Sequence, residues 1–201
     1  MLLALILTAC TDTTRYDPLP PGSLVLAFGD SVTYGTGAFE GEDYPTQLWK
    51  LTDWGVVNAG IPGDRTNTAR QRLPALLRLH RPDLVIIELG GNDFLRKRPE
   101  RQVKDDLEVM IRASQESGAV TALVAVPRLS LLRASTGTLK DSDIYAELAE
   151  ETGAILVADV FSSILSDEAL RADEIHPNGL GYRMLALGIA DELAEHGLLN
   201  R

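Results

Sequence analysis

The feature that most constrains the fold is a regular alternation of short apolar runs with longer amphipathic segments. Five runs of four to seven residues are rich in aliphatic and β-branched side chains, as expected for parallel strands that are covered on both faces. These runs are residues 24–28, 56–59, 84–89, 120–126 and 155–160. Successive runs begin roughly 30 residues apart, which is the length of a βαβ unit. The pattern predicts an α/β protein with a parallel sheet of about five strands.

The segments between these runs have helical periodicity. Apolar side chains recur every three or four residues in 66–79 and again in 100–117, where Gly118 follows as a plausible C-cap. A last amphipathic segment, 178–195, closes the chain, and we expect Leu180, Met184, Leu185, Leu187, Ile189 and Leu193 to supply most of its apolar face.

Length and charge narrow the possibilities further. A chain of 201 residues has room for one domain, and we assign residues 23–201 to it. The net charge of −10, without a basic cluster among aromatic residues, disfavours nucleic acid and anionic membrane surfaces as partners. The glycines after the first run, Gly29, Gly35 and Gly37, lack the spacing of a dinucleotide fingerprint or a P-loop, which disfavours nucleotide binding.

The N-terminal residues differ from the rest of the chain. Residues 1–10 are apolar but too short for a membrane span, which needs about 20 residues. Leu7–Cys10 resembles the lipobox of a bacterial lipoprotein signal, with Cys10 as the lipidated mature N-terminus, although the basic start of a signal is missing. An apolar tail or buried strand is the alternative. Residues 11–22 are polar and proline-rich and predict a tether. We therefore expect a periplasmic protein of the bacterial envelope, anchored through Cys10.

Ligands of such a sheet bind beyond the carboxyl ends of the strands, where the first run leads into "GDSVTYG". Taken alone, Ser31 in this stretch predicts a helix N-cap. A serine becomes a nucleophile only when a base removes its proton, so a catalytic role requires a histidine.

One of the three histidines meets this requirement. His80 lies at a predicted helix end and His196 near the chain end, whereas His176 lies in the predicted loop "DEIHPN" at the strand-end face. Asp173, three residues earlier, is placed to accept a hydrogen bond from Nδ1 of His176 and leave Nε2 as the base. A surface acid and a solvated histidine are the alternatives. We predict a catalytic triad of Ser31, His176 and Asp173.

Hydrolysis of an acyl ester also requires donors for the oxyanion. Gly63 offers an unshielded backbone N–H, and Asn92 in "LGGND" offers a side-chain amide at a strand end. Ordinary turns at either position are the alternatives. With the backbone N–H of Ser31, these groups predict an oxyanion hole of three donors.

These motifs resemble the four blocks of the SGNH, or GDSL, hydrolases. "FGDSVTYG" carries Ser31, "NAGIPGD" carries Gly63, "ELGGNDFLR" carries Asn92, and "DEIHPN" carries Asp173 and His176. The match is closest to the bacterial periplasmic thioesterase, lysophospholipase and arylesterase branch, which "RLPALL" at residues 72–77 also resembles. The resemblance implies a flavodoxin-like, doubly wound three-layer α/β/α sandwich.

The combined expectation is a serine hydrolase that cleaves carboxylic esters or thioesters of small or lipid-like acyl substrates through an acyl-enzyme, without metal or cofactor. A carbohydrate O-acetyl esterase is the enzymatic alternative, and a non-catalytic ligand-binding lipoprotein is the alternative from another class. The loop Pro127–Asp141 does not follow the branch. Its Leu129, Leu131 and Leu132 are candidates for lining the acyl site, but such residues as often pack against the domain.

Overall fold

The computed structural model describes residues 16–128 and 138–200, in which five parallel strands form one sheet. The strands are β1 (Leu24–Gly29), β2 (Gly55–Gly60), β3 (Leu84–Glu88), β4 (Val120–Val124) and β5 (Ile155–Val157). Their order is β2-β1-β3-β4-β5, and every neighbouring pair is parallel. The strand order reverses between β1 and β3, which is where ligands bind in folds of this order. The predicted α/β class and parallel sheet are confirmed.

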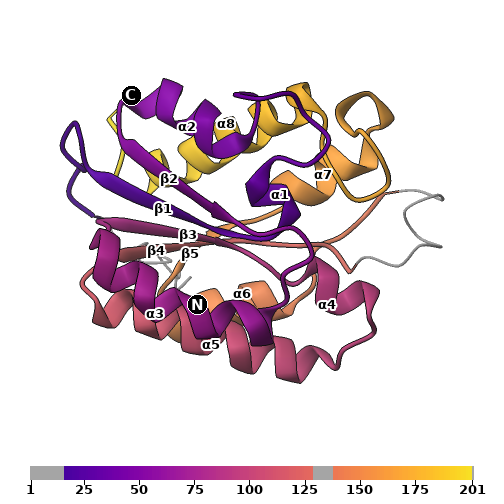
Figure 1. The fold of residues 1–201 in the computed structure, drawn as a ribbon, viewed down its shortest axis with the longest axis horizontal. Helices are drawn as coiled ribbons and strands as arrows, with labels where there is room; N and C mark the ends of the chain where they lie inside the picture. Colours follow the sequence, from indigo (N-terminus) through magenta and orange to yellow (C-terminus); the bar gives the residue numbers. More distant parts are fainter. Residues whose placement is uncertain (1–15, 129–137, 201) are drawn as a thin grey trace, which may run out of the picture.

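Helices cover both faces of the sheet, giving three layers (Figure 1). One layer contains α1 (Ser31–Tyr34), α2 (Tyr44–Thr52), α7 (Val160–Ser166) and α8 (Gly179–Glu195). The other contains α3 (Thr66–His80), α4 (Gly91–Leu95), α5 (Glu100–Glu116) and α6 (Ile144–Thr152). The expected helices 66–79, 100–117 and 178–195 correspond to α3, α5 and α8 with ends shifted by one residue.

The core forms where these layers meet. Val25 to Phe28 and Leu84 to Ile87 have no exposed surface, because both faces of these central strands are covered. The apolar stripe of α5 packs against the sheet as its periodicity predicts, with Val103, Leu107, Met110 and Ile111 buried.

The buried face of α8 follows the expectation at Leu185, Ile189 and Leu193 and differs from it at Leu180 and Met184. Leu180 and Met184 are 56% and 44% exposed, whereas Tyr182 is fully buried. Apolar residues lie almost all around this helix, so periodicity alone does not select a face. Gly181 does, because a Cβ there would lie 2.1 Å from the carbonyl oxygen of Leu170. Gly181 therefore faces the segment around Leu170, and this side of α8 is buried.

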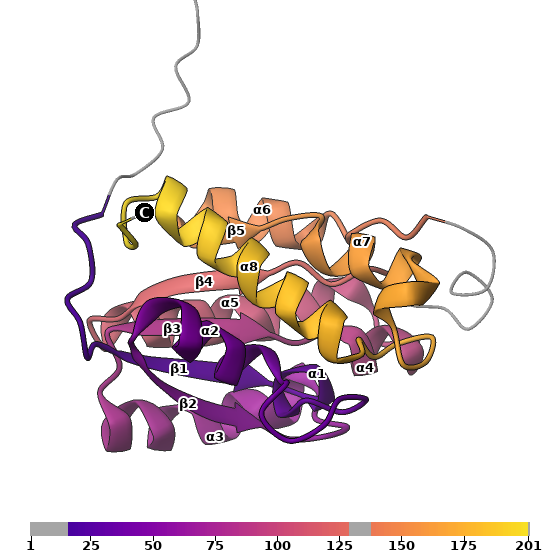
Figure 2. The same cartoon turned by 90° about the horizontal axis from the view of Figure 1, so that it is seen from above.

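The described part of the expected tether also differs from the prediction. Tyr16 donates a backbone hydrogen bond to the carbonyl of His196 (2.8 Å), and Leu19 donates one to Leu198 (2.9 Å). Both side chains pack against the core, at the C-terminal end of α8 and far from α1 (Figure 2). Within the described ranges no helix has the length and apolar character that a membrane span requires.

Candidate active site

Ser31 is the first residue of α1, directly beyond the carboxyl end of β1. The N-cap of this helix is Asp30, whose Oδ1 accepts a hydrogen bond from the Val32 amide at 3.0 Å. The hydroxyl of Ser31 is therefore not needed as the cap. It instead lies 3.0 Å from Nε2 of His176.

His176 and Asp173 lie in the tight loop between η1 (Glu168–Leu170) and α8. Nδ1 of His176 is 2.8 Å from Oδ2 of Asp173, and Oδ1 of Asp173 accepts the backbone amides of Ile175 and His176, both at 2.9 Å. Partial burial opposes ionisation of Asp173, but the hydrogen bonds from His176 and Ile175 outweigh it and lower the pKa of this carboxyl. An ionised Asp173 accepts a hydrogen bond from Nδ1–H and leaves Nε2 free to act as a base toward Ser31.

Asn92, in the first turn of α4 beyond β3, lies in the same place. Its Nδ2 donates to Oδ2 of Asp30 at 2.9 Å. Asn92, Ser31 and His176 all line a recess of about 20 Å³, enough for roughly one water-sized group. Its apolar walls are Val32, Leu95, Phe161 and Ile175.

Gly63 lies near Ser31 but does not line the recess. It lies in the turn after β2, where the Asp64 amide donates to the carbonyl of Ile61 at 3.0 Å. Its φ of +78° is a conformation that favours glycine. The turn is at the same edge of the sheet as Ser31, but Gly63 is not among the described residues that line the recess.

Two buried acids behind Ser31 were not singled out from the sequence. Asp30 is 3% exposed and Glu88, the last residue of β3, is 1% exposed. Burial raises the pKa of Asp30 to about 6, against the lowering effects of the Val32 amide and Asn92, and it raises the pKa of Glu88 well above its ordinary value. Their signal in the sequence is a carboxylic acid inside or directly after an apolar run.

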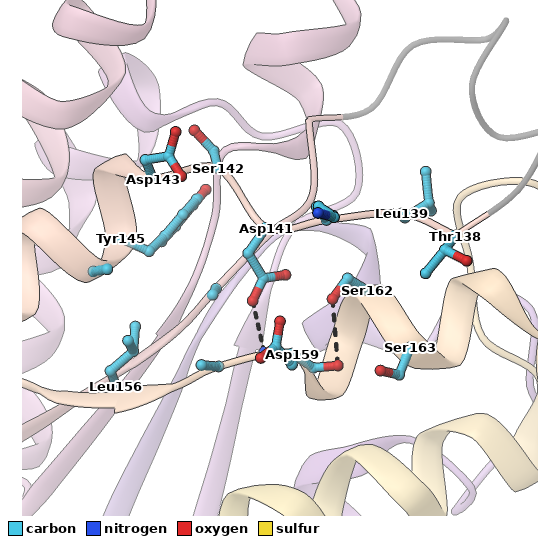
Figure 3. A pocket seen from close by; sticks show the side chains of 14 residues that line it. Thr138, Leu139, Asp141, Ser142, Asp143, Tyr145, Leu156, Asp159, Ser162 and Ser163 are labelled. Carbon is cyan, nitrogen blue, oxygen red and sulfur yellow. Dashed lines mark hydrogen bonds between the residues drawn. The ribbon is translucent and has the colours of Figure 1, made fainter.

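A second, larger cavity of about 500 Å³ lies where β4 and β5 end, beside α6 and α7 (Figure 3). Asp141, Asp143 and Asp159 line it, and Oδ2 of Asp141 accepts the Asp159 amide. None of the predicted triad residues lines this cavity. In residues 16–128 and 138–200 no group of three or more histidine, cysteine, aspartate or glutamate side chains is arranged to hold a metal ion. Leu129, Leu131 and Leu132, the candidate acyl-site residues, lie outside the described residues, as does Cys10.

The sequence pattern of the GDSL-like Lipase/Acylhydrolase family matches residues 27–184, a range that contains all the candidate catalytic and oxyanion residues. The chain belongs to this family. The resemblance predicted from four short motifs is thereby confirmed, and the protein is an ester hydrolase of the GDSL type.

Relatives of this GDSL hydrolase are similar over nearly their whole length. An arylesterase of Vibrio mimicus is 30% identical over 97% of this chain and 98% of its own. Thioesterase 1/protease 1/lysophospholipase L1 of Escherichia coli (strain K12) is 31% identical over 84% of this chain and 82% of its own. The crystal structure of a psychrotrophic esterase, EstA from Pseudoalteromonas sp., inhibited by monoethylphosphonate, superimposes with a TM-score of 0.73 at 26% identity, covering 86% of this chain and 97% of that one.

Proposed function

We propose that this GDSL hydrolase cleaves its substrate through an acyl-enzyme on Ser31, with His176 as the base and Asp173 as the group that orients it. The observation that carries the proposal is the continuous contact from Ser31 Oγ to His176 Nε2 (3.0 Å) and from His176 Nδ1 to Asp173 (2.8 Å). A serine, a base and an orienting acid in this order are the arrangement that activates a hydroxyl for nucleophilic attack.

The reaction takes two steps. Ser31 Oγ attacks the carbonyl carbon of the ester while its proton passes to Nε2 of His176, and the tetrahedral intermediate expels the alcohol or thiol, which takes that proton. Water then attacks the acyl-enzyme, gives a proton to Nε2, and releases the acid as the proton returns to Ser31. Asp173 remains ionised throughout and stabilises the imidazolium that forms in both steps.

The oxyanion of each intermediate needs donors on the side of Ser31 opposite His176. We assign this role to the backbone N–H of Ser31, the N–H of Gly63 and the Nδ2 of Asn92. Asn92 supports the assignment best, because one of its amide hydrogens is held by Asp30 at 2.9 Å and the other is free to point into the recess that Ser31 lines. Such donors strengthen as charge develops, so they accelerate the chemical step.

The small recess favours a short acyl group. Its volume of about 20 Å³, with apolar walls of Val32, Leu95, Phe161 and Ile175, suits a single methyl-sized group beside the carbonyl carbon and not a longer chain. Removal of acetyl groups, including those on carbohydrates, is therefore compatible with the site, alongside hydrolysis of other small esters and thioesters. The prediction is that kcat/KM falls steadily along p-nitrophenyl acetate, butyrate, octanoate and decanoate. A maximum at the longer chains would contradict a substrate with a short acyl group.

The catalytic assignment is tested by Ser31→Ala. We expect this variant to lose at least about 10³-fold in kcat on p-nitrophenyl acetate and butyrate, because no other group replaces the nucleophile. Ser163→Ala, which removes an exposed serine on α7, is the matched control and should retain the wild-type rate. A fluorophosphonate probe should label the wild type and Ser163→Ala but not Ser31→Ala. Equal rates of hydrolysis in all three proteins would contradict an acyl-enzyme on Ser31. A wild type that is neither labelled nor active on either ester would favour a ligand-binding protein.

We also propose that the protein is exported to the periplasmic side of the bacterial envelope and anchored there through a lipidated Cys10. The support is the lipobox-like stretch Leu7–Cys10 followed by a polar, proline-rich segment.

A further inference from the structure

Two buried carboxyl groups lie side by side beneath the candidate nucleophile. Asp30 follows β1 and Glu88 ends β3, and the register of these strands pairs Gly29 with Glu88, so both acids reach the same point of the sheet edge. Both line the recess that Ser31, Asn92 and His176 also line. Two ionised carboxylates at one buried place repel each other strongly, so such pairs share a single proton.

The groups around the two acids differ in what they stabilise. Asp30 accepts from the Val32 amide at 3.0 Å and from Nδ2 of Asn92 at 2.9 Å. Glu88 accepts at Oε2 from the hydroxyl of Thr33 at 3.2 Å, and Glu88 and Asp30 lie close enough for each acid to affect the pKa of the other. Two neighbouring carboxyl groups can hydrogen-bond to each other only when one of them carries a proton, so a single shared proton would give the pair one donor and one acceptor.

We propose that Glu88 holds this proton and donates it in a hydrogen bond to an ionised Asp30, so that Glu88 is a positioning residue for the Asn92 amide. This inference rests on the oxyanion role assigned to Asn92 in the proposed function. In this arrangement Oε2 of Glu88 remains an acceptor for Thr33, and Asp30 remains an acceptor for Val32, Asn92 and Glu88 together.

The position of the proton decides which way Asn92 points. An ionised Asp30 accepts only, so it holds the NH₂ end of the Asn92 side chain and excludes the flipped orientation. A protonated Asp30 would donate equally well to the carbonyl oxygen of a flipped Asn92, and that orientation would place an acceptor where the oxyanion forms. A neutral Glu88 therefore maintains the donor of the oxyanion hole without touching the substrate.

The other titratable groups around the pair fit this assignment. Proximity to His176 favours ionisation of Asp30. The titratable groups near Glu88 on the helices packed around it are tyrosines, which are neutral near pH 7. They are Tyr44 of α2, Tyr145 of α6 and Tyr182 of α8. Asp30 has two hydrogen-bond donors, the Val32 amide and Asn92, that favour its ionised form, while burial and the nearby charge of Asp30 raise the pKa of Glu88, in agreement with a proton on Glu88.

The protonation state can be measured without any assay of activity. Full-length protein labelled with carbon-13 glutamate is examined by NMR near neutral pH, and the Glu88 carboxyl resonance is assigned by its loss in Glu88→Gln. We expect the chemical shift of a protonated carboxyl group. The shift of an ionised carboxylate would overturn the proposal whether or not Ser31 proves to be the nucleophile, so the two hypotheses fail separately.

The positioning role is tested by three variants of the hydrolase. Glu88→Gln keeps a neutral donor to Asp30 and an acceptor for Thr33, so we expect it to retain at least about a tenth of the wild-type kcat. Glu88→Met keeps the size of the side chain without the donor, and its kcat should fall below a tenth of the wild-type value. Asp30→Asn preserves an N-cap but removes the anion, and we expect a loss of about 10²- to 10³-fold in kcat with little change in KM, as for loss of an oxyanion donor.

The control for these substitutions is Thr121→Val on β4, which alters a buried polar residue without a hydrogen-bond partner and should keep the wild-type kcat. Circular dichroism establishes that each variant is folded. A folded Glu88→Gln as slow as Asp30→Asn would overturn the proposal, because it would show that a charged Glu88 is required.

Discussion

Asp30 and Ser31 divide between them two tasks that the sequence assigns to one residue. A serine at the start of a helix ordinarily uses its hydroxyl to cap the free backbone amides. Here the carboxylate of Asp30 accepts the Val32 amide, so the Ser31 hydroxyl is left to His176, 3.0 Å away. The same carboxylate binds Asn92, and thus a single acid links the candidate nucleophile, the helix cap and the candidate oxyanion donor.

The buried proton of Glu88 has a consequence for stability. Burial raises the pKa of Glu88 above its ordinary value of 4.5. Between pH 4.5 and the raised pKa, the folded state therefore retains a proton that the unfolded state releases. The stability that this group contributes is complete below 4.5 and is lost as pH rises through the raised pKa.

Glu88→Gln has no such proton, so its free energy of unfolding should decrease less steeply with pH than that of the wild type. We expect the difference between the two proteins to change by up to about 1.4 kcal/mol per pH unit as the pH rises above 4.5 toward the raised pKa of Glu88. Urea unfolding at several pH values measures it. Parallel curves for the two proteins would contradict a raised pKa at Glu88.

At the scale of elements, Arg72 of α3 joins the loops that carry the site. Its Nη2 donates to the carbonyl of Gly29 at the end of β1, its Nη1 to Ala59 near the end of β2, and its Nε to Asp64, each at 2.9 Å. The guanidinium also lies over the ring of Phe28, 4.0 Å from its centre. Gly29 precedes Asp30 and Ser31, and Asp64 follows Gly63, so one side chain fixes both candidate oxyanion loops.

Replacement of Arg72 should therefore impair catalysis from a distance. We expect Arg72→Lys to lower kcat by about 10- to 100-fold with little change in KM, because the single nitrogen of an ammonium group cannot reach the three acceptors that Nε, Nη1 and Nη2 of Arg72 contact, and the two loops shift. Arg78→Lys, at an exposed position on the same helix, is the matched control and should behave as the wild type. Steady-state kinetics on p-nitrophenyl acetate distinguish the two, and an unaffected Arg72→Lys would show that the loops are held by other contacts.

At the scale of the whole molecule, the described N-terminal residues and the active site lie at opposite ends of α8. Tyr16 bonds to His196 beyond the C-terminus of this helix, whereas His176 and Asn178 precede its N-terminus. A helix of 17 residues is about 25 Å long. The described residues nearest in sequence to Cys10 therefore lie at the end of the molecule remote from Ser31.

This arrangement predicts that anchoring and catalysis are independent. In a bacterial host we expect Cys10→Ser to move the protein from the membrane fraction to the soluble fraction, while kcat on p-nitrophenyl acetate stays at the wild-type value. Mass spectrometry of the mature wild-type N-terminus should show a diacylglyceryl cysteine. An unmodified Met1 in the wild type would contradict the lipoprotein proposal without affecting the catalytic one.

Much of the fold and of the candidate site was accessible from the sequence because it depends on local patterns. The strands β1 to β5 and the helices α3 and α5 follow from apolar periodicity, and Ser31, Asn92, Asp173 and His176 lie in short motifs after strand ends. The exposed side of α8 was predicted wrongly, since Leu180 and Met184 are apolar yet face solvent, and only contact with Leu170 selects the buried side.

The sequence by itself determined the order of the elements, the GDSL family and the residue types that the chemistry needs. Only the tertiary structure decided that Asp30 is the cap, that Glu88 lines the same recess, and that Arg72 joins β1, β2 and the Gly63 turn. The reason is physical: each of these contacts joins residues from separate strands and helices, and their distance depends on the strand register and not on the neighbouring sequence. A buried acid has no local signature of its protonation, because its pKa is set by the groups that folding places around it.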